Sequence, residues 1–124
     1  MKAIYLTKNG SAKDSFNTRE SDIPTPQSHE VQIQVQAFGL NFADVLARQG
    51  MYKDAPPFPA VLGYEVVGHI TQAGNEVKDF RVGQRVVAFT RFGGYSEYVV
   101  TDTRAIANIP EDWDKGTALA LATQ

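Results

Sequence analysis

The sequence has 124 residues, which is long enough for one domain with a single hydrophobic core. Its net charge is -2, its pI is about 5.6 and no run of Lys or Arg occurs, which argues against an extended phosphate-binding surface for nucleic acid. The chain has no cysteine, which excludes disulfides, thiolate zinc ligands and cysteine nucleophiles.

The first third of the chain predicts two strands with a loop between them. Residues 31–37 alternate apolar and polar side chains, which is the period of a strand with one buried face. We expect residues 3–6 to form its partner strand. Residues 21–30 contain Pro24 and Pro26 among polar side chains, which predicts an irregular loop.

A helix is predicted next, over residues 41–50. Asn41 can cap its first turn, with Asp44 three residues further on, and Gly50 is a suitable C-terminal stop. Three prolines between residues 51 and 60 then predict an extended, rigid loop.

The rest of the chain predicts a series of short strands. Four segments are rich in β-branched and aromatic side chains and are separated by Gly-containing turns: 65–72, 85–90, 95–101 and 105–109. This pattern predicts a mostly-β domain, built as a small barrel or a sandwich. No apolar run approaches the roughly 20 residues of a membrane helix, so we expect no membrane span.

The C-terminal segment predicts a second helix. Asp114 can cap it, and residues 117–122 are apolar nearly all round, so protein should cover this helix. Two interpretations remain open. Either the chain is a fragment cut inside the element that leads to a further domain, or the helix packs on its own barrel.

Residue chemistry by itself predicts no reaction. His29 and His69 are the only histidines, and neither belongs to a metal-binding or catalytic pattern. Gly93 and Gly94 lack the strand–glycine–helix context that phosphate binding requires. We therefore assign no catalytic residue and no metal site.

Several ordered segments nevertheless resemble one known family along almost the whole chain. They are residues 1–4, 31–37, 39–44, 47–52, 59, 63–68, 82–86 and 94–98. Together they resemble the GroES-like N-terminal domain of a zinc-independent quinone oxidoreductase of the medium-chain dehydrogenase/reductase family, in the branch that is similar to vesicle amine transport proteins. The resemblance implies a GroES-like, partly open β-barrel with one or two short helices over residues 1–124. It also implies that the family's nucleotide-binding Rossmann domain is absent from this chain.

Two positions carry the mechanistic part of the resemblance. Zinc alcohol dehydrogenases of the family have a Cys where Asn41 stands and a His where Tyr64 stands. An amide and a neutral phenol are poor zinc ligands, so the resemblance implies the zinc-independent branch. It also implies that Asn41, Tyr52 and Tyr64 line the substrate and cofactor cleft. The alternatives are an N-cap role for Asn41 and simple aromatic packing for both tyrosines.

The implied reaction is hydride transfer from NADPH to a quinone or a conjugated enone. Such acceptors are already electrophilic, so no metal is needed to polarise them. NADPH would be bound mainly by the missing domain, so we expect this chain alone to be inactive. We further expect a cytoplasmic homodimer with a small-molecule substrate and no nucleic-acid partner. The alternative is a non-catalytic GroES-like module for assembly or partner binding.

Overall fold

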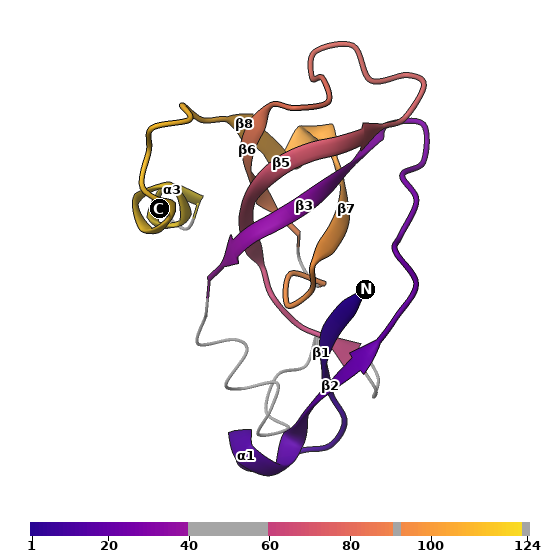
Figure 1. The fold of residues 1–124 in the computed structure, drawn as a ribbon, viewed down its shortest axis with the longest axis vertical. Helices are drawn as coiled ribbons and strands as arrows, with labels where there is room; N and C mark the ends of the chain where they lie inside the picture. The colour runs from indigo at the N-terminus through magenta and orange to yellow at the C-terminus, as the bar shows by residue number, and fades with distance from the viewer. Residues whose placement is uncertain (40–59, 91–92, 123–124) are drawn as a thin grey trace.

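The computed structural model describes residues 1–39, 60–90 and 93–122 (Figure 1). Within these ranges the chain is built mainly of short strands, with little helix. In chain order the elements are β1 (Lys2–Leu6), α1 (Ala12–Ser15), β2 (Phe16–Glu20), β3 (Glu30–Phe38), β4 (Ala60–Val61), β5 (Glu65–Ala73), β6 (Arg85–Phe89), β7 (Tyr98–Asp102), η1 (Thr103–Ala105), β8 (Ile106–Asn108) and α3 (Lys115–Ala122).

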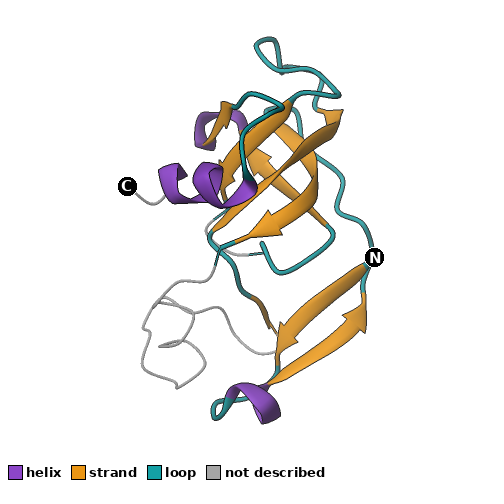
Figure 2. Cartoon of the chain, turned by 60° about the vertical axis from the view of Figure 1, so that its left-hand side comes forward, coloured by secondary structure: helices purple, strands orange, loops and turns teal. Residues whose placement is uncertain are grey.

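The strands form two antiparallel sheets. The smaller has the order β2-β1-β4 and the larger the order β7-β3-β5-β6-β8. The larger sheet curls, which brings β7 close to β6 although these strands are not neighbours in the sheet. The hydroxyl of Thr101 in β7 donates to the carbonyl oxygen of Phe89 in β6 at 3.2 Å. Figure 2 shows this curved sheet above the smaller one. The expected mostly-β, partly open barrel is confirmed.

The alternation in β3 sets the inside of the barrel. Strand β3 lies between β5 and β7 in the sheet. Its residues Val31 and Ile33 are fully buried, whereas its residue Gln34 is exposed to solvent. The buried residues of β3 pack with residues of β5, β6 and β7 into one core: Val66, Ile70, Val86, Ala88 and Val99. The strand predicted from alternation is therefore confirmed, with its apolar face inward.

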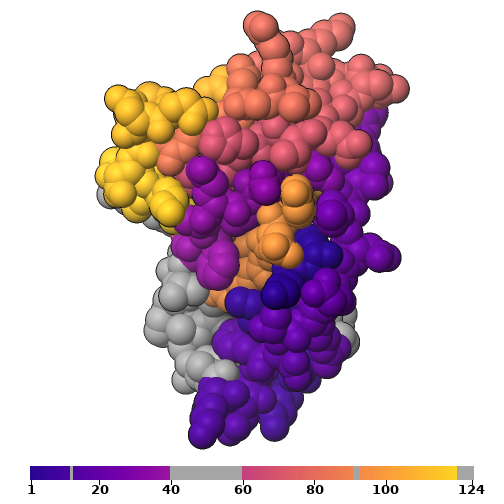
Figure 3. Space-filling model, in the orientation of Figure 1, coloured from indigo at the N-terminus to yellow at the C-terminus, as the bar shows by residue number. Residues whose placement is uncertain are grey.

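A short segment before β7 joins the two sheets. The amide of Ile4 in β1 donates to Tyr95 O at 2.9 Å, and the amide of Val35 in β3 donates to Glu97 O at 2.8 Å. The Tyr95 ring packs on Phe38, with ring centroids 4.7 Å apart. Figure 3 shows the indigo N-terminal residues beside this orange segment.

The pairing expected for residues 3–6 is wrong. β1 pairs with β2 and β4, while β3 pairs with β5 and β7. The chain turns back through α1 and places Phe16 opposite Leu6, so β2 occupies one edge of β1. The sequence does not predict β2, because its residues 17–20 are all exposed and show no alternation of apolar and polar side chains.

The remaining boundaries differ little from the expected ones, apart from one strand. The strand expected at 95–101 begins at Tyr98, because residues 95–97 are used to join the sheets. The loop expected at 21–30 is confirmed over 21–29, and Glu30 begins β3. The helix predicted for residues 41–50 lies outside the described residues.

Helix α3 packs on the larger sheet. Its first turn is capped by Asp114, whose Oδ2 accepts from the amide of Thr117 at 3.2 Å. Ala118 is fully buried against Val67 of β5 and Val87 of β6, and Figure 2 shows the helix lying across that sheet. The helix therefore packs on its own barrel through Ala118, and the interpretation that the chain is a fragment of a longer protein stays a prediction.

Candidate functional site

Gly39, the one described residue of the family-like segment 39–44, meets the segment 63–68 where β3 ends and β5 begins. Phe38 pairs with Val66, and the amide of Gly39 donates to Glu65 O at 3.1 Å. Residues far apart in sequence are thereby brought to one edge of the barrel. This junction is the described part of the candidate site.

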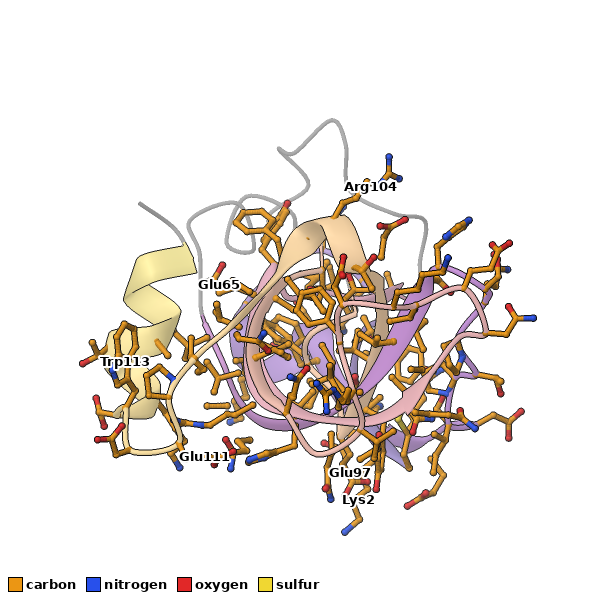
Figure 4. The ribbon with its side chains drawn as sticks, turned by 90° about the horizontal axis from the view of Figure 1, so that it is seen from above. Lys2, Glu65, Glu97, Arg104, Glu111 and Trp113 are labelled. Carbon is orange, nitrogen blue, oxygen red and sulfur yellow. The ribbon has the colours of Figure 1, made fainter. Side chains whose placement is uncertain are left out.

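Glu65 is a buried carboxylate at this junction. Its residue is only 3% exposed, and a Cβ placed on Gly39 would lie 2.0 Å from Glu65 Oε1. A side chain at position 39 would therefore require the Glu65 carboxylate to move. In Figure 4, Glu65 lies well away from the exposed Lys2 and Glu97. Sequence reasoning gave Glu65 no role at the site, although a charged residue at the head of an apolar strand was a usable signal.

Tyr64 lies in a bend just before β5, where Thr90 makes two hydrogen bonds to the backbone. Its carbonyl oxygen accepts from the amide of Thr90 at 2.6 Å, and the carbonyl of Gly63 accepts from the Thr90 hydroxyl at 2.7 Å. Gly63 has φ +113°, and Gly94 packs directly against it. The side chain of Tyr64 is half-buried and its hydroxyl oxygen is inaccessible to solvent. Hydrogen bonds from Thr90 therefore tie the backbone at Tyr64 to the end of β6.

The other two predicted cleft residues, Asn41 and Tyr52, lie outside the described residues. They belong to the segment that leaves β3 at Gly39 and returns at Ala60, where Ala60 pairs with Leu6. Their place in the cleft stays a prediction.

Both histidines are engaged in ion pairs with glutamates. His29 Nε2 lies 2.9 Å from Glu76, and His69 Nε2 lies 3.1 Å from both carboxylate oxygens of Glu111. Among the residues described, no group of three or more His, Asp or Glu side chains could hold a metal ion. Whether the whole protein works without zinc stays a prediction.

A hollow lies along β6, β8 and the approach to α3. Its volume is about 410 Å³ and it is largely apolar, with Phe89, Ile106 and Trp113 in its lining. Arg104 stands at its rim and pairs with Asp102, and hydrogen bonds from Arg104 lower the pKa of the Asp102 carboxyl. This pair caps η1, because Asp102 Oδ1 also accepts from the Arg104 amide at 2.9 Å. We assign the Asp102–Arg104 pair a structural role.

Comparison with known families agrees with the fold. The family model described as "Alcohol dehydrogenase GroES-like domain" matches residues 27–111, which is more than half of the chain. The chain belongs to this family. The GroES-like barrel expected from the sequence is therefore confirmed, and with it the medium-chain dehydrogenase/reductase family of its relatives.

Two curated relatives illustrate the GroES-like family at the sequence level. The "Synaptic vesicle membrane protein VAT-1 homolog-like" of Mus musculus is 35% identical over 121 residues, covering 98% of this chain and 29% of the relative. The "Quinone oxidoreductase" of Lama guanicoe is 33% identical over 124 residues, covering 98% of this chain and 38% of the relative. The chain thus spans about a third of the length of the curated relatives it matches.

Solved structures of GroES-like relatives match the fold equally well. The human synaptic vesicle membrane protein VAT-1 homolog-like protein superposes with a TM-score of 0.91 at 34% identity, over 97% of this chain and 38% of that structure. The Escherichia coli quinone oxidoreductase complexed with NADPH gives a TM-score of 0.88 at 29% identity, over 97% of this chain and 36% of that structure. In the described parts of the present chain, neither α1 nor α3 is long and apolar enough to cross a bilayer.

Proposed function

We propose that this chain is the substrate-side domain of an NADPH-dependent, zinc-independent oxidoreductase that transfers hydride to a quinone or a conjugated enone. The supporting observation is that Gly39 meets the family-like segment 63–68: the amide of Gly39 donates to Glu65 O, and the amide of Thr90 donates to the carbonyl oxygen of the adjacent Tyr64. A fixed aromatic side chain at a barrel edge is suited to orient a flat, apolar acceptor.

In the proposed reaction, the main task of this domain is to orient the acceptor. The nicotinamide supplies the hydride when it is bound, and the protein must position the acceptor and exclude water. We assign Tyr64 to the wall of the cleft, together with Asn41 and Tyr52. Because the hydroxyl oxygen of Tyr64 is already buried, we assign its ring to positioning and give the hydroxyl no proton-transfer role.

NADPH enters this proposal from the complex with the E. coli quinone oxidoreductase. The sequence of this chain has no Gly-rich phosphate loop in a strand–turn–helix context, so we propose that a separate nucleotide-binding domain holds most of the cofactor. On its own the 124-residue chain would then not oxidise NADPH. We further propose that the complete protein is a homodimer in the cytoplasm. Sedimentation velocity of the complete protein tests whether it is a dimer.

The test is NADPH oxidation by a protein that combines this chain with its nucleotide-binding domain. With para-benzoquinone or a conjugated enone as acceptor, Tyr64→Ala should raise the KM for the acceptor about tenfold, because it removes a binding wall. Tyr64→Phe keeps the ring and should change that KM by less than about threefold. Tyr98→Phe, on β7, is the matched control.

Two results would contradict the proposal. The first is the absence of NADPH oxidation with every quinone and enone tried, which would favour the non-catalytic GroES-like module. The second is an acceptor KM that Tyr64→Ala leaves unchanged.

A further inference from the structure

Arg85, the first residue of β6, makes an unusual set of contacts for a buried cation. It is only 6% exposed. Its Nη1 donates to the carbonyl oxygens of Trp113 at 2.6 Å, Pro110 at 2.8 Å and Glu111 at 3.3 Å. Its Nε donates to Gln36 Oε1 at 3.2 Å. One guanidinium on the sheet thus binds the main chain of the whole turn that precedes α3.

This turn has few other ties to the sheet. The amide of Ile109 donates to Arg85 O at 3.0 Å, and the Glu111 carboxylate lies beside His69 of β5. Glu111 and Trp113 lie next to α3 in Figure 4. Because the Arg85 bonds go to carbonyl oxygens, they depend on the path of the backbone and not on the side chains of the turn. The planar guanidinium can serve several acceptors at once, which a lysine ammonium does less well.

Helix α3 depends on this turn for its position. It has eight residues, and a helix of that length is marginal in water without tertiary contacts. Its buried anchor is Ala118, a small side chain against Val67 and Val87. The turn held by Arg85 therefore fixes where α3 begins, and Ala118 fixes which face it turns to the sheet.

We propose that Arg85 is a positioning residue. By holding the turn 110–113, it fixes α3 against β5 and β6 and so sets how the nucleotide-binding domain, when present, faces Tyr64. The part of this proposal that concerns the second domain rests on the function proposed above. Strand β5 links Tyr64 to α3, because it begins next to Tyr64 and carries Val67, on which α3 packs.

The anchor itself can be tested on this chain, which contains a single tryptophan in the turn that Arg85 binds. Arg85→Met should release the turn. Trp113 emission should then shift to longer wavelength, and its acrylamide quenching constant should rise about twofold as the segment opens locally. Arg85→Lys keeps the charge and should give an intermediate change, which also covers the case in which the methionine variant does not fold.

Two control variants separate the anchor from general charge effects. Arg81→Met removes an exposed arginine from the loop before the same strand and should leave Trp113 emission unchanged. Glu111→Gln leaves the carbonyl acceptor in place while it removes the carboxylate beside His69, so it too should leave the emission close to that of the wild type. Unchanged Trp113 emission and quenching in both Arg85 variants would overturn the proposal.

The positioning role needs a kinetic measurement in the two-domain protein. A misplaced second domain should raise the KM for the quinone about tenfold in Arg85→Met, because the acceptor sits between the domains, while the KM for NADPH stays within about twofold. Simple loss of folded protein would lower the rate and leave both KM values unchanged. An unchanged quinone KM alongside altered Trp113 emission would overturn the positioning role. A wild-type protein that does not oxidise NADPH would instead contradict the proposed function, and the fluorescence alone would then decide whether Arg85 anchors α3.

Discussion

Gly63 occupies a position that no other residue can fill without moving the backbone opposite. Its φ is +113°, and a Cβ there would lie 2.7 Å from Gly94 Cα and 2.8 Å from the Tyr95 amide nitrogen. Gly63→Ala should therefore lower the free energy of unfolding by about 3 kcal/mol, through backbone strain and steric overlap together. Urea denaturation measures this change.

Gly83 provides the matched control. It also has positive φ, +97°, but nothing lies within 4 Å of a Cβ placed there. Gly83→Ala should lower the free energy of unfolding by only about 1 kcal/mol, the cost of the backbone conformation alone. Equal losses in the two variants would show that the contact with Gly94 contributes nothing.

The burial of Glu65 could not be predicted from the sequence. Its identity was visible, and so was its place next to Tyr64, but its burial was not. The contact between its carboxylate and Gly39 joins residues that are distant in sequence, and only the pairing of β3 with β5 brings them together.

At the scale of elements, α3 is the part of the fold whose position is least determined by its own sequence. Its residues are apolar on most sides, so the helical pattern does not specify which face is buried. The structure buries Ala118 and leaves Lys115, Gly116 and Thr117 exposed. The small side chain lets the helix approach the sheet closely.

Ala118→Leu should accordingly destabilise the protein. Three extra carbon atoms would overlap Val67 and Val87, and overpacking of this kind lowers the free energy of unfolding by about 2 kcal/mol. Thr117→Leu adds apolar atoms on the exposed side of the same turn and should change stability by less than about 0.5 kcal/mol. Thermal or urea unfolding of the two variants distinguishes a buried from an exposed helix face. An Ala118→Leu variant as stable as the wild type would mean that α3 does not pack as described.

At the scale of the whole molecule, the two sheets are held together around Tyr95. This residue is 5% exposed, its ring contacts Phe38 and Phe16, and its amide donates to Leu62 O at 2.9 Å. One aromatic side chain thus contacts residues from both sheets.

Tyr95→Ala should lower the free energy of unfolding by about 4 kcal/mol, as expected for truncation of a buried aromatic side chain. Because the ring joins the sheets, the variant should also lose cooperativity, and the denaturant dependence of its unfolding should become shallower. Tyr98→Ala, on the less buried β7 position, should cost about half as much or less and keep a single transition. A fully cooperative Tyr95→Ala protein would show that other contacts couple the sheets.

Much of the fold could be predicted because local chemistry determined it. The alternation of residues 31–37 specified a strand with one buried face, prolines specified the loop before it, and Asp114 specified the start of α3. The order of the family-like segments specified the GroES-like barrel. Asn41 and Tyr64 could likewise be singled out from the sequence, because an amide and a phenol at those positions are poor zinc ligands whatever the fold.

Only the tertiary structure decided which elements meet. β1 pairs with β2 and β4 instead of β3, Glu65 is buried against Gly39, and Arg85 binds the turn before α3. Each of these results is a contact between residues far apart in the chain. Backbone hydrogen bonds and packing of this kind depend on how the whole chain closes on itself, so no local pattern of side chains encodes them.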